Sequence, residues 1–180
     1  MKRWILLLVL VAAVGATPVS AKEGTYIGLY FPKTDIAGEA GTGLDSGSGW
    51  GGRIGVGFGR YAAIEANYTS TSHDVTGGGS VDMKGVAVDF KLHFPLTSLD
   101  SAKVMTLEPY ALIGYGMYDL GSPISASGSG LQLGVGIELY LFRELSINAG
   151  YTRTKVTFDT TPEADGTIRQ LDFGVMYHFI

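Results

Sequence analysis

The fold is decided by a stretch that reads LQLGVGIELYL and runs from Leu131 to Leu141. Its odd-numbered positions all carry branched aliphatic side chains, and its even-numbered positions are small or polar, Glu138 among them. Successive side chains of a β-strand point to opposite faces of the sheet. The alternation therefore predicts one long strand with a wholly apolar face and a small or polar one.

The same period of two recurs along the rest of the chain. Residues 86–94 and 171–179 repeat it clearly, with Val, Leu, Phe and Tyr alternating with small, polar or charged residues. Weaker copies occupy residues 26–31, 53–59, 64–69, 106–118 and 145–152. These segments predict eight strands, and no change in composition marks a second domain.

The expected connections between these strands alternate in length. Tight turns are expected at residues 60–61 and 142–144, and a somewhat longer connection at residues 95–103. The longer loops are expected at residues 32–49, 73–80, 119–128 and 159–166. This rhythm predicts an all-β fold, an eight-stranded antiparallel up-and-down barrel with short turns at one end and longer loops at the other.

The first 21 residues have the features of a cleavable signal peptide. Lys2 and Arg3 form a positive start, residues 4–14 form a short apolar core, and Val19 and Ala21 place small residues before the cleavage site. This pattern predicts export and cleavage after Ala21. The expected domains are a signal peptide at residues 1–21 and a barrel domain at residues 22–180.

The composition excludes several classes of protein. Mean hydropathy is +0.21 and only 17% of residues are charged, yet the chain after residue 21 has no apolar run long enough for a spanning helix. Removing Lys2 and Arg3 from the 13 basic residues leaves 11 against 17 acidic ones, which argues against a nucleic-acid partner. The chain has no cysteine and hence no disulfide.

The polar face of the strands distinguishes two kinds of barrel. A soluble barrel turns its apolar face inward, whereas a membrane barrel turns that face to the lipid. The polar face is rich in Gly, Ser, Thr and Ala, which suits a narrow interior, and a Lys or Arg facing mid-bilayer would cost roughly 2–4 kcal/mol. The charges expected in the barrel interior are Arg53, Glu65, Asp89, Lys91, Glu108, Glu138 and Asp172.

Aromatic residues are predicted to form a girdle at each end of the barrel. Such rings concentrate at the two membrane–water interfaces of a membrane barrel. The expected lower girdle consists of Phe58, Tyr61, Phe94, Phe142, Tyr177 and Phe179. The expected upper girdle consists of Phe31, Trp50, Tyr68, Tyr115 and Tyr151. Since an open sheet edge is excluded from hydrocarbon, the eight strands are expected to close into a transmembrane ring.

Four stretches resemble a known family. They read GFGRYAAIEANY at residues 57–68, EPYALIGYG at 108–116, GVGIE at 134–138 leading to Tyr151, and GVMYHF at 174–179. Together they resemble the small outer-membrane β-barrels of the OmpA, OmpX and opacity-protein kind, the porin-like outer-membrane β-barrel domain family. The resemblance implies an eight-stranded barrel in the outer membrane of a Gram-negative-type bacterium.

The resemblance also implies an assembly partner. In this family the last strand carries alternate hydrophobic residues that lead to a terminal aromatic, which the barrel-assembly machinery recognises. The alternation from Leu171 to Phe179 is similar to that signal, although Ile180 follows the aromatic here. Further expected partners are outer-membrane lipids and lipopolysaccharide, and the protein is expected to be a monomer.

No catalytic, cofactor-binding or metal site is expected, and no cofactor. Two alternatives remain open. His93 and His178 both face the interior near the lower end in the expected register, where a metal site or a proton-sensitive gate is conceivable. His73, with Ser70 or Ser72 nearby, is expected at the upper rim, where a lipid-modifying barrel enzyme would place catalytic groups.

The upper loops are acidic, and three basic residues are expected near the upper rim. The acidic residues are Asp35, Glu39, Asp45, Asp74, Asp119, Asp159, Glu163 and Asp165. Their carboxylates suit divalent cations shared with lipopolysaccharide phosphates, while solvated loops are the simpler reading. Lys84, Arg153 and Arg169 are placed to meet lipid phosphates directly.

The leading functional hypothesis is a non-enzymatic outer-membrane barrel with acidic surface loops. Its interior is expected to be plugged by side chains, because eight strands enclose a space just wide enough for them. Its expected role is envelope integrity or surface interaction. The alternatives are a narrow gated channel for ions or small solutes and a lipid-modifying barrel enzyme.

Overall fold

The computed structural model describes residues 24–59, 61–94, 96, 106–122, 124–159 and 164–179. A short 3-10 helix, η1, spans Glu39–Gly41. The strands are β1 Gly24–Gly38, β2 Gly47–Phe58, β3 Ala62–Asp74, β4 Ser80–His93, β5 Thr106–Leu120, β6 Ala126–Tyr140, β7 Leu145–Phe158 and β8 Ala164–His178. The expected signal peptide at residues 1–21 lies outside the described residues.

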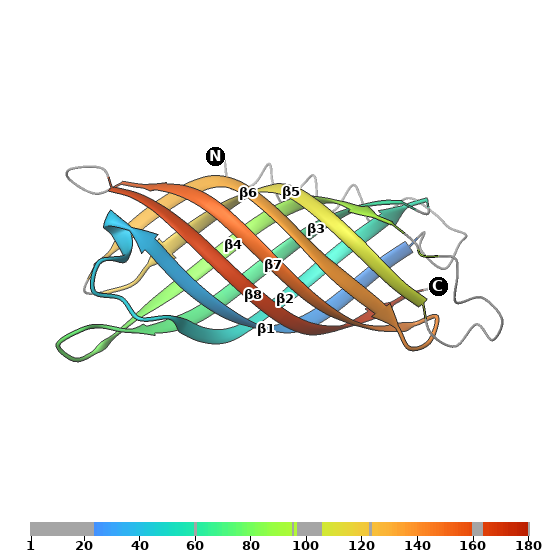
Figure 1. Cartoon of the computed structure of the whole chain (residues 1–180), viewed down its shortest axis with the longest axis horizontal. Helices are drawn as coiled ribbons and strands as arrows, with labels where there is room; N and C mark the ends of the chain where they lie inside the picture. The colour runs from blue at the N-terminus through green and yellow to red at the C-terminus, as the bar shows by residue number, and fades with distance from the viewer. Residues whose placement is uncertain are drawn as a thin grey trace.

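Eight tilted strands close into one ring (Figure 1). Each strand pairs antiparallel with the next along the chain, and β1 pairs with β8, for example Phe31 with Phe173. Closure gives every strand two hydrogen-bonded neighbours, so the described ring has no open sheet edge. The predicted fold class, an eight-stranded antiparallel up-and-down barrel, is confirmed. Within the described residues, no helix is long and apolar enough to cross a membrane.

The barrel has a terminal end and a loop end. The start of β1, the end of β8 and the connections β2–β3, β4–β5 and β6–β7 lie at the terminal end, and the other four connections lie at the loop end. The strands extend further toward the loop end than the sequence predicted. β1 continues to Gly38, β3 continues to Asp74 and β6 begins at Ala126. The long loops predicted at residues 32–49, 73–80, 119–128 and 159–166 are therefore wrong in extent.

The missed strand length has a physical reason, which is a change in the phase of the alternation. In β4 the apolar side chains of Val86 and Phe90 point outward and are exposed, whereas Val81 and Met83 point inward and are fully buried. Gly85 separates the two patterns. A strand predicted from one continuous apolar face therefore ends where the apolar side chains change face, although the backbone pairing of β4 continues through this point.

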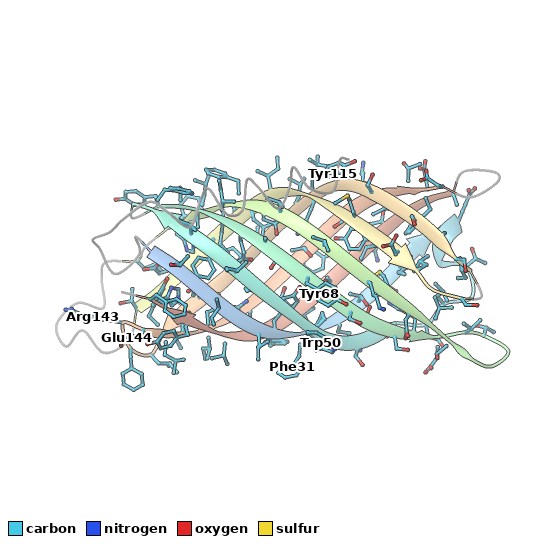
Figure 2. All side chains as sticks on the ribbon, turned by 180° about the vertical axis from the view of Figure 1, so that it is seen from behind. Phe31, Trp50, Tyr68, Tyr115, Arg143 and Glu144 are labelled. Atoms are coloured by element: carbon cyan, nitrogen blue, oxygen red, sulfur yellow. The ribbon has the colours of Figure 1, made fainter. Side chains whose placement is uncertain are left out.

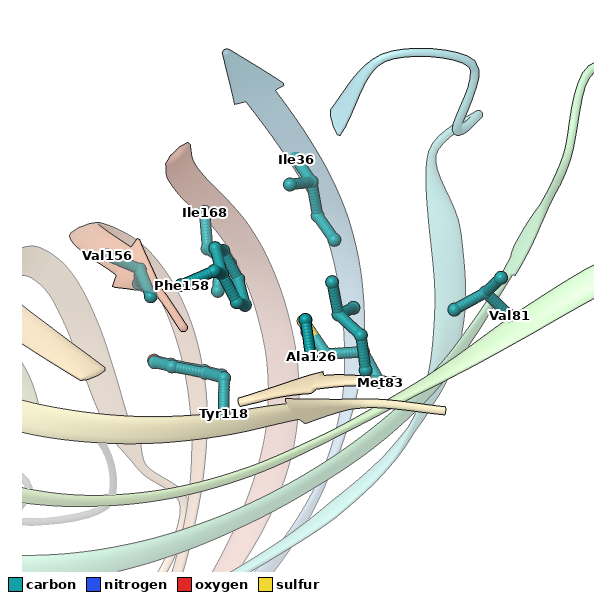
Figure 3. Packing of buried hydrophobic residues seen from close by; sticks show 9 residues of the cluster. Ile36, Val81, Met83, Tyr118, Ala126, Val156, Phe158 and Ile168 are labelled. Atoms are coloured by element: carbon teal, nitrogen blue, oxygen red, sulfur yellow. The ribbon is translucent and has the colours of Figure 1, made fainter. Parts of the chain in front are cut away.

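The polarity of the barrel inverts along its axis. Over the terminal half, apolar side chains such as Leu29 and Val135 are 65% and 59% exposed on the outer face, and charged ones such as Asp172 are buried inside. Over the loop-end half, the interior is apolar instead (Figure 3). That loop-end core comprises Ile36, Val81, Met83, Tyr118, Leu120, Ala126, Val156, Phe158 and Ile168.

Glycines on the inner face make room for large rings from neighbouring strands. A Cβ at Gly51 would overlap the ring of Tyr30, and a Cβ at Gly55 would overlap the ring of Tyr26. Gly52 lies beside Gly51 in β2, yet its Cβ would meet only a backbone oxygen at 3.9 Å. Because Gly51 and Gly55 have no side chain, the tyrosine rings can pack directly against the backbone of β2.

We expect Gly51→Ala to lower the free energy of unfolding by about 1–3 kcal/mol, because the added methyl group displaces the buried Tyr30 ring. Gly52→Ala is the matched control and should change it by less than about 0.5 kcal/mol. Urea titrations of the barrel refolded into lipid vesicles, read by heat-dependent gel mobility, measure both values. Equal losses in the two variants would contradict this packing.

Candidate functional site

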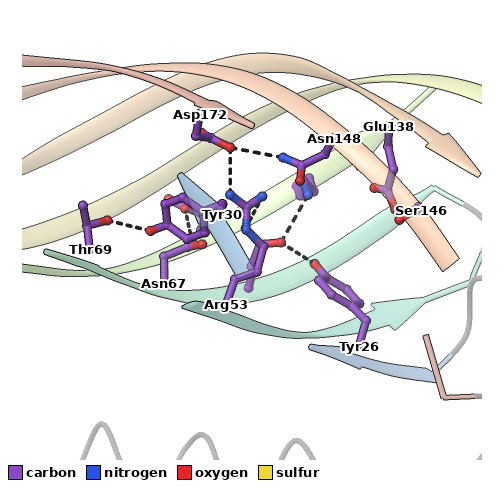
Figure 4. A network of polar contacts seen from close by, with 12 residues as sticks. Tyr26, Tyr30, Arg53, Asn67, Thr69, Glu138, Ser146, Asn148 and Asp172 are labelled. Carbon is purple, nitrogen blue, oxygen red and sulfur yellow. Dashed lines mark hydrogen bonds and ion pairs between the residues drawn. The ribbon is translucent and has the colours of Figure 1, made fainter. Parts of the chain in front are cut away.

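The centre of the barrel interior is a network of buried ion pairs (Figure 4). Arg53 of β2 donates from Nη2 to Asp172 Oδ1 of β8 at 2.8 Å, and its Nη1 lies 3.8 Å from Glu65 Oε1 of β3. Lys91 of β4 donates from Nζ to Glu65 Oε2 at 3.2 Å. The network therefore links strands on opposite sides of the ring.

Tyrosine rings close on this network from both sides. The Arg53 guanidinium lies 4.3 Å from the centroid of Tyr30, and the Lys91 ammonium lies 4.2 Å from that of Tyr110. Tyr26 donates its hydroxyl to Glu65 at 2.9 Å. Rings stacked on cations exclude water while favouring the positive charge, so the charged centre is also densely packed.

Asp89 forms a second polar centre nearer the loop end. Asn67 donates to its Oδ2 at 2.8 Å, and Gln132 donates to both of its oxygens at 3.0 Å. Tyr118 and Thr154 in turn donate to Gln132 Oε1 at 2.9 and 3.0 Å. The buried carboxylate is thus held by uncharged amides, with hydroxyls behind them.

Glu108 and Glu138 form a third centre near the terminal end, as direct cross-strand neighbours on β5 and β6. Ser146 donates to Glu138 at 2.7 Å, and His178 Nε2 lies 3.1 Å from it. His93 Nδ1 lies 3.8 Å from Glu108. Each histidine therefore faces a different glutamate. The described residues contain no group of three or more His, Cys, Asp or Glu placed to hold a metal ion.

The structure places all seven side chains expected in the interior inside the ring, each at most 7% exposed. The space left between them is small. Two cavities of about 20 Å³ each lie beside the network, one bordered by Arg53 and Asp89 and the other by His93 and Tyr140. Each has room for about one water molecule.

His73 does not lie in a loop, as the sequence predicted, but within β3 with its ring fully buried in the barrel. Its Nε2 lies 3.0 Å from Thr34 Oγ1, and its Nδ1 lies 2.9 Å from the backbone oxygen of Asp45. Ser70 and Ser72 alternate with His73 along the strand, so their side chains point to the outer face. The two serines and the His73 ring therefore lie on opposite faces of β3.

The aromatic residues predicted for the two girdles lie on the outer face in two layers. The lower layer lies near the terminal end, and its six rings are between 46% and 64% exposed. The upper layer lies part-way along the barrel, and not at the end of the strands as the sequence predicted (Figure 2). β1 runs beyond Phe31 and β7 beyond Tyr151. The strands thus extend past the membrane-facing band.

Four of the eight acidic residues predicted for the loops lie on strands, because the strands are longer than expected. Asp35, Asp74, Asp119 and Asp165 belong to β1, β3, β5 and β8. Asp35 lies 3.7 Å from the guanidinium of Arg169. Glu163 lies outside the described residues.

A family model described as the outer membrane protein beta-barrel domain matches residues 4–179 of this chain. The chain belongs to that family. It is an outer-membrane β-barrel, as the sequence resemblance predicted, and its location in the outer membrane of a Gram-negative bacterium is confirmed. A search of curated proteins finds no match.

Solved structures share the fold of this outer-membrane barrel. Ail of Yersinia pestis is 17% identical, with a TM-score of 0.55 over 87% of this chain and 99% of its own. Neisserial surface protein A is 17% identical, with a TM-score of 0.57 over 87% and 98%. OprG of Pseudomonas aeruginosa is 17% identical, with a TM-score of 0.52 over 88% and 97%. At these identities the likeness is one of fold.

Sequence reasoning missed two parts of the interior. The polar partners Asn67, Gln132 and Asn148 give no signal of their own, because the register that brings them to a carboxylate is set by the closed ring. The loop-end core did leave a signal, the phase slip of the apolar alternation.

We expect Asp172→Ala to lower the free energy of unfolding by about 3–5 kcal/mol, because it breaks a buried ion pair and leaves Arg53 with one carboxylate. Glu144→Gln, at the exposed turn between β6 and β7 (Figure 2), is the control and should be nearly neutral. Urea unfolding in vesicles, with gel mobility as readout, compares the two. A neutral Asp172→Ala would show that the network contributes little.

Proposed function

We propose that this protein is a non-enzymatic, monomeric outer-membrane barrel with a plugged interior, whose role is envelope integrity or surface interaction. The observation that carries the proposal is the set of side chains that cross the ring. Ion pairs and tyrosine rings cross the interior, and the cavities beside them are about 20 Å³ each. A continuous aqueous path would require these buried charged pairs to separate.

A gated channel is the less favoured alternative. Barrels with wide aqueous channels have about 16–18 strands, whereas this ring has eight. The loop-end core adds a second barrier, because Val81 and Phe158 are fully buried in an apolar cluster above the charged centre. An ion would have to pass both a charged plug and an apolar one.

A lipid-modifying enzyme is disfavoured by the position of His73. A general base must reach the nucleophile that it activates. The ring of His73 contacts threonines and a backbone carbonyl inside the barrel, while Ser70 and Ser72 belong to the outer face. The pairing that the enzyme hypothesis needs is therefore divided between the two faces of β3.

Surface interaction is supported by the exposed loop end and by one structural neighbour. Ail has been solved in complex with the heparin analogue sucrose octasulfate, and that chain is 18% identical, with a TM-score of 0.55 over 87% of this chain and 99% of its own. The loop end of this protein is carried on long paired strands above the aromatic layer. It is therefore well placed to meet molecules outside the cell.

The plug is tested by planar-bilayer recording. We expect the folded wild-type barrel to give no steady ionic current, since its interior is filled. A general porin recorded in the same chamber checks sensitivity, and a heat-unfolded sample checks for leakage. A steady current that is altered in Arg53→Gln would overturn the plugged-barrel proposal and favour the channel.

Export and assembly complete the proposal. Cleavage after Ala21 would release the barrel domain into the periplasm. The last strand would then present its outward residues Phe173, Val175 and Tyr177, with Phe179 beyond the strand end, to the barrel-assembly machinery. All four side chains are exposed on the outer face, where a recognising protein can reach them.

We expect Phe179→Ala to reduce the amount of folded barrel in the outer membrane several-fold without changing its unfolding free energy by more than about 1 kcal/mol. Phe142→Ala removes another exposed aromatic of the lower layer and serves as the control. Membrane fractionation with immunoblotting measures the yield. An equal loss in both variants would assign the effect to the girdle and not to recognition.

A further inference from the structure

The outer face of the barrel changes charge in layers just beyond the upper aromatic layer. On β1, the outward side chains run from Phe31 to Lys33 and then to Asp35. On β4, they run from Val86 to Lys84. The order is the same on these two strands: an apolar residue that faces lipid, then a cation, then an acid, which is Asp35 on β1 and Asp82 on β4. The cations therefore form a distinct layer directly above the membrane-facing band.

The cations of this layer gather on one side of the barrel. We call the outward residues Lys33 of β1, Arg169 of β8, and Arg153 and Lys155 of β7 the cationic patch. All four are exposed. β1, β8 and β7 are consecutive neighbours in the ring, so the patch is continuous across three strands. Among the ion pairs of the described residues, one includes a residue of the patch: Asp35 lies 3.7 Å from Arg169.

The two arginines of the patch form a direct cross-strand pair, because Arg153 lies opposite Arg169. Like charges opposite one another on the same face destabilise a sheet. Arg169 retains 49% side-chain exposure and Asp35 retains 51%, so the guanidinium has room for another anion. Two guanidinium groups at the spacing of a strand pair suit the bidentate recognition of a phosphate.

Lys84 provides the contrast within the same layer. It is outward-facing on β4, on a different side of the ring, and its cross-strand partners are Ser70 and Asp119. It is one cation with a carboxylate directly across the strand pair, whereas the patch has four cations on three adjacent strands, of which Arg169 lies opposite Asp35. The asymmetry indicates a localised site and not a uniform ring of charge.

We propose that the cationic patch binds the phosphate groups of an outer-leaflet glycolipid of the lipid A type, with Arg153 and Arg169 clamping one phosphate. The depth of the patch favours a lipid over a soluble anion. Arg153 follows Tyr151, and Arg169 precedes Leu171, by two positions along the same outward face. The residues below face acyl chains, so a phosphate held here belongs to a molecule anchored in the bilayer.

Direct contact with cations differs from the route through divalent ions that the acidic residues suggest. Carboxylates bind lipid phosphates only through a shared metal ion, whereas guanidinium groups bind them without one. On β1, Lys33 lies closer to the aromatic layer than Asp35, and Arg169 lies directly opposite Asp35. Binding through the patch should therefore persist in the presence of EDTA.

The inference rests on the proposed outer-membrane role and is tested on the full mature barrel in nanodiscs. The probe is diphosphoryl lipid A, compared with lipid A from which both phosphates have been removed, with and without EDTA. Lipid retained by the captured barrel is measured by mass spectrometry over a titration. We expect Arg153→Gln/Arg169→Gln to weaken retention of the diphosphoryl form by at least about tenfold, as expected for lost charge-assisted bonds.

Two further variants separate the site from its surroundings. Lys84→Gln removes one cation from the same layer outside the patch and should leave retention unchanged. Arg153→Lys/Arg169→Lys keeps the charge but loses bidentate geometry and should fall between the wild type and the glutamine variant. Heat-dependent gel mobility confirms that each variant is folded.

Several outcomes would overturn the inference. The first is equal retention of lipid A with and without its phosphates. The second is a loss of lipid A retention in Lys84→Gln as large as the loss in the double glutamine variant. The third is a loss of retention on adding EDTA, together with unchanged retention in the double glutamine variant. Binding of a sulfated polysaccharide through the two arginines, with no retention of lipid A, would assign the patch to a soluble polyanion. None of these changes whether the barrel conducts, so a failure here is distinct from a failure of the plug.

Discussion

The structure depends on one constraint, that a backbone amide in hydrocarbon has no water to bond with. The chain meets it by pairing every strand on both sides, including β1 with β8. Closure fixes the register all the way round, and the register in turn brings Arg53 to Asp172 although 119 positions separate them in the sequence. The interior chemistry is thus a consequence of the ring, which holds its charges at fixed positions.

The same strands serve two different solvents. In the bilayer the outer face is apolar and the interior is polar, and beyond the upper aromatic layer the arrangement is reversed. The switch occurs within continuous strands, as between Val86 and Met83 of β4. Backbone pairing does not depend on which face is apolar, so the sheet continues while the side chains exchange roles. The position at which the apolar side chains change from the outer to the inner face therefore marks the boundary of the membrane.

This switch also decides how much the sequence could predict. The eight strands, the closed ring and the placement of charges such as Glu138 in the interior follow from the alternation of single segments. The extent of the strands does not follow from it. If a strand is expected to have one apolar face throughout, its predicted end falls where the apolar side chains change face, and the residues beyond are assigned to a loop. His73 was placed in a loop for that reason. The partners of Asp89 required the three-dimensional register, which no local pattern contains.

The loop-end core has a consequence for recognition. Ile36, Met83 and Phe158 belong to one buried apolar cluster inside the ring beyond the bilayer, so the projecting part of the barrel is stabilised by its own buried apolar surface, as a small soluble protein is. Two of the connections take part in this core, because Leu44 and Val75 are partly buried against it and form a β-bridge with one another. A partner that binds these two connections therefore meets segments that are already ordered, and it loses less conformational freedom on binding.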